Sequence, residues 1–246
     1  MRKIYLTFIS FIILSCSNDG SNETLESEGL LIKQINENGL VSRKYTYQNN
    51  LISSREYYES GELWRKEYFE YSNDTVFFRS YNSSNELAEI RKYYSITDNL
   101  SRRDRFDSSN NLMNYRLYNF SNNNCGFISI DIYDSNNILI SKSTYDYLDL
   151  NCSMESTRYD SNNEIISKEK WTRDNKNLFN KNELLDFFRG SNLGNTTKYT
   201  RWNSQNNIDL NNSYSSSFQY NNLNYPTYES REYSNGNLKE ITYEYY

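Results

Sequence analysis

The chain has 246 residues, of which 36% are hydrophobic, and a formal net charge of −5. A mildly acidic chain without a basic tract is not expected to bind nucleic acid. It has no histidine, which excludes Ser–His and Cys–His dyads and the H-E-x-x-H zinc motif, and it has no glycine-rich phosphate loop. We therefore expect a protein that is not an enzyme and that holds no cofactor.

Residues 1–15 have the pattern of a secretion signal peptide. Arg2 and Lys3 precede an apolar run over residues 4–14. A helix of that length spans only about 16 Å, which is too short for a hydrocarbon core of about 30 Å. The run therefore predicts export and not a transmembrane helix.

The signal peptide ends in the sequence Ile13-Leu14-Ser15-Cys16, which resembles the lipobox of bacterial lipoproteins. The resemblance implies that Cys16 becomes the lipidated first residue of the mature chain. Ser17, in place of an aspartate, implies an outer-membrane location, on either the periplasmic or the surface face. An ordinary signal peptide with an incidental cysteine is the alternative.

Residues 16–28 are rich in serine, asparagine, glycine and acidic residues, which predicts a flexible tether. The rest of the chain, residues 29–246, is expected to form one all-β domain. The whole chain has 25 tyrosines and 16% aromatic residues, and disordered chains are poor in aromatic residues. No proline-rich or glycine-rich linker divides this domain.

An aromatic residue, an aspartate- or asparagine-rich tetrapeptide and an aliphatic residue recur along the chain. The clearest copies cover residues 81–87, 106–112, 133–138 and 159–165, at steps of 25, 27 and 26 residues. Aspartate and asparagine side chains cap tight turns, and asparagine tolerates positive φ. Each copy therefore predicts a β-hairpin, and such a period indicates stacked units.

Successive hairpins are expected to pair into an antiparallel meander. In the last segment Ile241, Tyr243 and Tyr245 alternate with Thr242 and Glu244, as in a half-buried strand. The turns imply roughly 14 to 18 strands, and open sheets of that size twist, coil or fold over. The predicted fold is therefore a large twisted or folded-over sheet.

The repeated core, Y-D-x-x-N/G-x-L, resembles the YD repeats of RHS-type secreted proteins and, less closely, MORN-type hairpin repeats. The resemblance covers most of residues 40–246. It implies a β-hairpin style without a long RHS shell or a terminal toxin. It also implies an immunity or antitoxin-like partner as an alternative function.

One segment departs from the repeat. Asn180 and Glu183 precede apolar residues at helical spacing, and Gly190 follows, which predicts a short helical insertion near residues 180–190. The helix is expected to plug one face or end of the sheet. A helical lid over a ligand groove is the alternative.

Cys125 and Cys152 hold equivalent places before neighbouring hairpins. The cell envelope permits disulfides, so we expect a bridge between them, although a regular meander would hold them about 9.6 Å apart. Two sulfurs without any histidine leave too few ligands for zinc, so no metal site is expected.

The charged residues alternate along the strands, as in Arg55-Glu56 and Arg65-Lys66-Glu67. This pattern predicts a solvated face with cross-strand ion pairs. The leading functional hypothesis is therefore a non-enzymatic envelope lipoprotein, attached to the membrane through Cys16, that serves as a scaffold or binding surface for a protein or glycan. An envelope glycoside hydrolase that uses paired carboxylates is the least favoured alternative.

Overall fold

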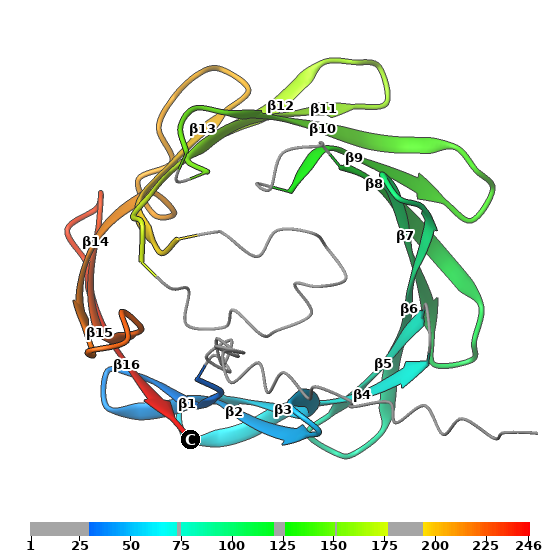
Figure 1. Cartoon of the computed structure of the whole chain (residues 1–246). Helices are drawn as coiled ribbons and strands as arrows, with labels where there is room; N and C mark the ends of the chain where they lie inside the picture. The colour runs from blue at the N-terminus through cyan, green and yellow to red at the C-terminus, as the bar shows by residue number, and fades with distance from the viewer. Residues whose placement is uncertain (1–29, 73–74, 121–125, 151, 177–193) are drawn as a thin grey trace, which may run out of the picture.

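The chain forms a closed barrel. The computed structural model describes residues 30–72, 75–120, 126–150, 152–176 and 194–246. Sixteen antiparallel strands follow one another around a ring, and β1 pairs with β16. Figure 1 looks along the barrel and shows each strand beside its neighbours in the sequence. An even number of strands lets the first and last strands of a meander pair antiparallel.

The strands run in sequence order around the wall. They are β1 (Ile32–Glu37), β2 (Leu40–Gln48), β3 (Leu51–Glu59), β4 (Glu62–Ser72), β5 (Thr75–Asn82), β6 (Leu87–Thr97), β7 (Leu100–Asp107), β8 (Leu112–Phe120), β9 (Phe127–Asp134), β10 (Leu139–Tyr147), β11 (Met154–Asp160), β12 (Ile165–Arg173), β13 (Thr196–Asn203), β14 (Tyr214–Tyr220), β15 (Pro226–Tyr233) and β16 (Leu238–Tyr245).

The predicted turns are present and have the predicted chemistry. At the β9–β10 turn, Asp134 Oδ1 accepts hydrogen bonds from the backbone N–H groups of Asn136 and Ile138, both at 2.8 Å. Asn137 has a φ of 66°, a conformation that asparagine tolerates better than most residues. The same pair of side-chain bonds recurs at Asn82, Asp107, Asp160, Asn203 and Asn221.

The strand register separates two walls. Register partners on neighbouring strands share one face of a sheet. One row runs through Tyr45, Arg55, Glu67, Ser80 and Glu89, on β2 to β6, and all of these except the partly exposed Arg55 are buried. Side chains on the concave face of a closed barrel converge, so this buried face is the inner wall. The alternating positions form the outer wall.

The largest apolar cluster lies on the inner wall and crosses the closing seam between β16 and β1. Its members come from β1 to β6 and from β16: Ile32, Ile35, Tyr45, Ile52, Phe69, Val76, Phe78, Tyr93, Ile241 and Tyr243. This cluster joins residues that lie more than 200 positions apart in the chain, such as Ile35 and Tyr243, which are register partners. Apolar burial therefore helps to close the ring.

The structure corrects two predictions. The resemblance to YD, RHS-type and MORN-type repeats is wrong as an architecture, because these hairpins close into a single barrel. The open twisted or folded-over sheet is wrong for the same reason, whereas the all-β antiparallel meander and its strand number are confirmed. Closure pairs both edge strands, and it removes the unpaired edges that an open sheet would expose.

The predicted helix near residues 180–190 lies outside the described residues, as do the signal peptide and the whole tether. None of the described residues forms a helix that could span a membrane.

Candidate functional site

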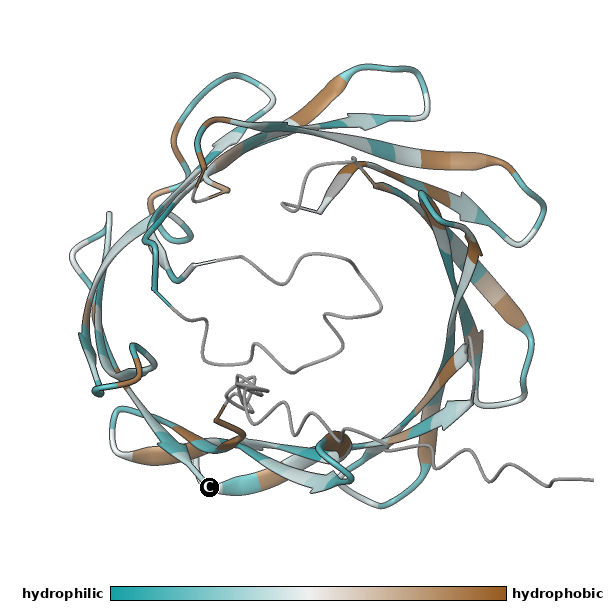
Figure 2. Cartoon of the chain, in the orientation of Figure 1, coloured by the Kyte–Doolittle hydropathy of each residue, from teal (hydrophilic) through white to brown (hydrophobic). Residues whose placement is uncertain are grey.

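The outer wall is polar and charged along its whole circumference. Figure 2 shows hydrophilic colours in every part of the ring, with hydrophobic stretches that are short. On the outer wall Lys66 pairs with Glu56 at 2.9 Å and Lys170 pairs with Glu155 at 2.7 Å. The β14 residues Ser215, Ser217 and Gln219 are exposed, whereas Ser216, Phe218 and Tyr220 are half-buried. A lipid-facing barrel needs an apolar band about 25 Å tall, and this wall has none among the described residues.

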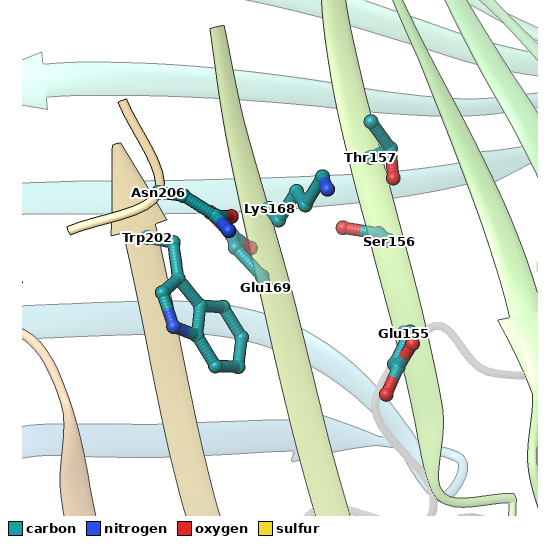
Figure 3. Close-up of a pocket in the computed structure, with 7 residues that line it drawn as sticks. All are labelled: Glu155, Ser156, Thr157, Lys168, Glu169, Trp202 and Asn206. Atoms are coloured by element: carbon teal, nitrogen blue, oxygen red, sulfur yellow. The ribbon is translucent and has the colours of Figure 1, made fainter. Parts of the chain in front are cut away.

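A shallow hollow of about 310 Å³ lies on the wall at strands β11 to β13 (Figure 3). Trp202 and Lys168 are register partners on β13 and β12, and Thr157 is the partner of Lys168 on β11. All three belong to the outer wall. Asn206 reaches the hollow from the β13–β14 turn, where it has a φ of 67°. The hollow thus combines one large aromatic ring with hydroxyl, amide and ammonium groups.

Two glutamates also border this hollow, but they belong to different walls. Glu155 lies on the outer wall and pairs with Lys170. Glu169 belongs to an inner-wall row, where Arg201 lies 3.8 Å from it. A glycosidase needs two carboxylates that flank one bond, and glutamates on opposite walls do not form such a pair.

The inner wall carries most of the arginines, and the outer wall carries most of the lysines. Arginine is more weakly hydrated and forms planar hydrogen-bonded pairs, so it suits the more buried wall. The inner-wall arginines are Arg43, Arg55, Arg65, Arg91, Arg103, Arg105, Arg116, Arg158, Arg173, Arg201 and Arg231, and the outer-wall lysines are Lys44, Lys66, Lys92, Lys142, Lys168, Lys170 and Lys198.

Glu67 is one of the two most enclosed charges of the described inner wall, with 1% of its surface exposed. Arg55 lies 2.7 Å from one carboxylate oxygen and Arg65 lies 2.8 Å from the other. A buried carboxylate is tolerated when it is paired and hydrogen-bonded. The prediction that Arg55, Arg65 and Glu67 form a solvated face is therefore wrong for Glu67.

Glu89 repeats this arrangement with Arg91 and Arg105, the latter at 2.6 Å. Burial raises the pKa of Glu89, but the two guanidiniums together lower it by more, so its pKa lies below the usual value.

Glu229 forms a third buried cluster on the inner wall and is 1% exposed. It accepts hydrogen bonds from Ser216 and Tyr243, both at 2.6 Å, and pairs with Arg231 at 2.7 Å. Burial and the nearby Glu229 raise the pKa of Tyr243.

Arg103 and Arg116 differ from these clusters because no carboxylate of the described residues pairs with either. They are register partners on β7 and β8, and the Nε–H group of each is buried without a hydrogen-bond acceptor. Arg173 on β12 and Arg65 in the Glu67 cluster have buried Nε–H groups of the same kind, so the missing carboxylate is what distinguishes Arg103 and Arg116 from Arg65. Within the part of the chain that the structure describes, Arg103 and Arg116 therefore lack an acidic partner.

Sequence reasoning missed both the Trp202 hollow and the inner-wall arginines. A usable indication was present in the dipeptides Arg43-Lys44, Arg65-Lys66 and Arg91-Lys92. Neighbouring residues of a strand point to opposite faces, so each dipeptide places an arginine on the inner wall and a lysine on the outer wall.

The predicted site residues are only partly within the described chain. Cys16 and Cys125 lie outside the described residues, so lipidation and the disulfide stay predictions. Cys152 precedes β11, is 1% exposed and has a φ of 59°. Among the described residues no three histidine, cysteine, aspartate or glutamate side chains lie close enough together to hold a metal ion.

Comparison with known proteins supports the barrel fold. No protein-family model matches the chain, and no curated protein matches it by sequence. A porin-like protein from Bacteroides uniformis is similar in structure, with a TM-score of 0.52 and 12% identity over 83% of this chain and 89% of that one. A porin-like protein from Bacteroides vulgatus has a TM-score of 0.51 and 12% identity over 89% of this chain and 99% of that one. At this identity the likeness shows a shared barrel fold.

Proposed function

We propose that this protein is a non-enzymatic lipoprotein of the cell envelope that stands in water and binds a glycan in the Trp202 hollow. The lipid on Cys16 attaches it to the outer membrane, and the barrel itself does not enter the bilayer. The observation that carries the proposal is the Trp202 hollow on an outer wall with many charged and hydroxyl side chains at mid-strand positions.

The polar outer wall supports a water-exposed barrel. The centre of each lipid-facing strand would have to be apolar, because a lysine or arginine at the bilayer midplane costs about 2–4 kcal/mol. Here Lys66, Lys168 and Lys170 occupy mid-strand positions of the outer wall. The porin-like neighbours support an envelope location, whereas the charge on the outer wall argues against a membrane pore.

The composition of the hollow supports a glycan ligand. An indole ring offers an apolar face with a polar edge, which suits the apolar face of a sugar ring. Thr157, Lys168 and Asn206 supply donors and acceptors for sugar hydroxyl groups. A pocket that combines an aromatic surface with a few polar groups is typical of small-ligand sites.

The other two functions proposed from the sequence have less support. The immunity or antitoxin-like role depended on the resemblance to RHS-type and MORN-type repeats, which the barrel overturns. The glycoside hydrolase required paired carboxylates, and the glutamates at the hollow lie on opposite walls.

A glycan array on the purified full-length protein tests the proposal. We expect binding to a limited set of glycans, and we expect Trp202→Ala to weaken it at least about tenfold, because buried or stacked tryptophans dominate many binding sites. Trp64→Ala is the matched control, since Trp64 is 45% exposed at another part of the barrel. Absence of glycan binding, or equal binding by Trp202→Ala, would contradict the proposal.

A further inference from the structure

The inner wall has a positive cluster at the centre of strands β7 and β8. Arg103 and Arg116 are register partners, and the Cβ atoms of such partners lie about 4.5–5.5 Å apart. Like charges directly opposite each other in a sheet are destabilising. An anion between the guanidiniums of Arg103 and Arg116 would remove this repulsion.

The neighbouring inner-wall clusters show what is absent here. Glu67 lies between Arg55 and Arg65, and Glu89 lies between Arg91 and Arg105. Across the described residues, no acidic side chain takes the corresponding place between Arg103 and Arg116. The Nε–H groups of both arginines are buried and have no acceptor among the described residues, and the one side-chain hydrogen bond found for Arg116 there is to the neutral Tyr118.

The surroundings increase the positive potential at this place. Arg91 and Arg105 are also register partners, and they share the single carboxylate of Glu89. Burial and the nearby Arg103 both lower the pKa of Arg116. Two guanidiniums that have no carboxylate partner among residues 30–72, 75–120, 126–150, 152–176 and 194–246 lie next to two that share one. Such a group of charges attracts anions with more than one charge.

We propose that Arg103 and Arg116 bind a phosphate group, either as the free ion or as part of a phosphorylated small molecule. Guanidinium groups match the geometry of phosphate and form paired hydrogen bonds with it. A phosphate carries a charge of about −1.5 to −2 at pH 7, which neutralises both arginines, whereas one carboxylate neutralises one. Both side chains are partly exposed, so a small ligand can reach them. This site is independent of the Trp202 hollow.

Thermal unfolding and calorimetric titration of the full-length protein test the site, at constant ionic strength, with inorganic phosphate, glucose 6-phosphate and acetate as probes. We expect both phosphates to bind and to raise the melting temperature, and acetate to bind at least about tenfold more weakly. Binding of glucose 6-phosphate alone would identify a phosphorylated molecule as the ligand. Equal binding of acetate, or no binding by either phosphate, would overturn the proposal.

The variants Arg103→Gln and Arg116→Gln should each weaken phosphate binding at least about tenfold, since hydrogen bonds to charged groups are among the stronger ones. In phosphate-free buffer they should be at least as stable as the wild type, because each removes a repulsion between like charges. Lys198→Gln is the matched control, since it removes one positive charge from an exposed position of the outer wall. Equal loss of binding in Lys198→Gln would show general electrostatic attraction and would overturn the site.

Discussion

At the residue scale, the inner wall depends on pairing between buried charges. Glu67 holds two guanidiniums at 2.7 and 2.8 Å while it is almost fully enclosed. Loss of its charge would leave Arg55 and Arg65 without a counter-ion in a place that water reaches poorly. The penalty for an uncompensated buried charge is far larger than the contribution of an exposed ion pair.

We therefore predict that Glu67→Gln lowers the free energy of unfolding by about 3–5 kcal/mol. The control is Glu155→Gln, which breaks the exposed pair with Lys170 on the outer wall and should cost no more than about 1 kcal/mol. Urea unfolding followed by circular dichroism measures both. Equal effects of the two substitutions would mean that the Glu67 cluster is not enclosed.

Buried tyrosines predict a loss of stability at alkaline pH. Burial raises the pKa of Tyr145 and of Tyr147 from 10.0 to about 12. The unfolded chain releases these protons first as the pH rises, so their contribution is intact below about pH 10 and is lost between about pH 10 and 12. Tyrosinate absorbance and circular dichroism, followed together, should show ionisation coincident with unfolding. Ionisation of every tyrosine near pH 10 in a folded barrel would contradict this.

At the element scale, the turns were the most predictable part of the fold. An aspartate or asparagine followed three residues later by an asparagine specifies the tight turn of a β-hairpin. The hydrogen bonds that Asp134 accepts at the β9–β10 turn are those that the sequence predicts. The alternation of Ile241 and Tyr243 with polar residues also placed buried side chains correctly. These features depend only on near neighbours in the chain.

The β9–β10 turn offers a direct test of this local chemistry. Asp134→Ala removes two hydrogen bonds to backbone N–H groups and should lower the free energy of unfolding by about 1–2 kcal/mol. Asn137→Gly keeps the positive φ accessible but removes the hydrogen bond that Tyr115 donates to Asn137 Oδ1 at 3.1 Å, so it should cost about 1 kcal/mol. Asn137→Val loses the same bond and adds the penalty for a left-handed residue, so it should cost at least about 2 kcal/mol. Urea unfolding distinguishes the three. The same cost for glycine and valine at position 137 would contradict the turn geometry.

The predicted disulfide would join two connections between strands. Cys152 lies in the β10–β11 connection, and Cys125 lies between β8 and β9. Mass spectrometry of unreduced peptides should find the two cysteines linked, and reduction should lower stability by roughly 3 kcal/mol, because a loop of about 27 residues is then no longer closed. Two free thiols in the secreted protein would refute the bridge.

At the scale of the whole molecule, closure could not be predicted from the sequence. The hairpins of an open meander and of a barrel have the same turns and the same alternation. The difference lies in the seam, where Ile35 meets Tyr243 and Asn36 meets Thr242, and no local pattern marks such distant partners. The Trp202 hollow and the Arg103–Arg116 pair were missed for the same reason, because each depends on the register of neighbouring strands.

The polar character of both walls sets this barrel apart from one that faces lipid. Ion pairs such as Lys66–Glu56 and Lys170–Glu155 occupy the outer wall, and arginine–glutamate clusters occupy the inner wall. A closed sheet satisfies its backbone hydrogen bonds in water as well as in lipid, so the fold does not by itself require a membrane. The charged outer side chains are the reason for proposing a barrel that stands in water.

The most direct test of a water-facing barrel is thiol labelling on the lipidated protein in lipid vesicles. Ser217→Cys places a thiol at the middle of β14 on the outer wall, and Ser216→Cys places one on the inner wall. We expect a water-soluble maleimide to label Ser217→Cys as fast as a free peptide thiol and well above the unsubstituted protein. Protection of Ser217→Cys from that reagent, together with rapid reaction with a lipid-soluble maleimide, would contradict it.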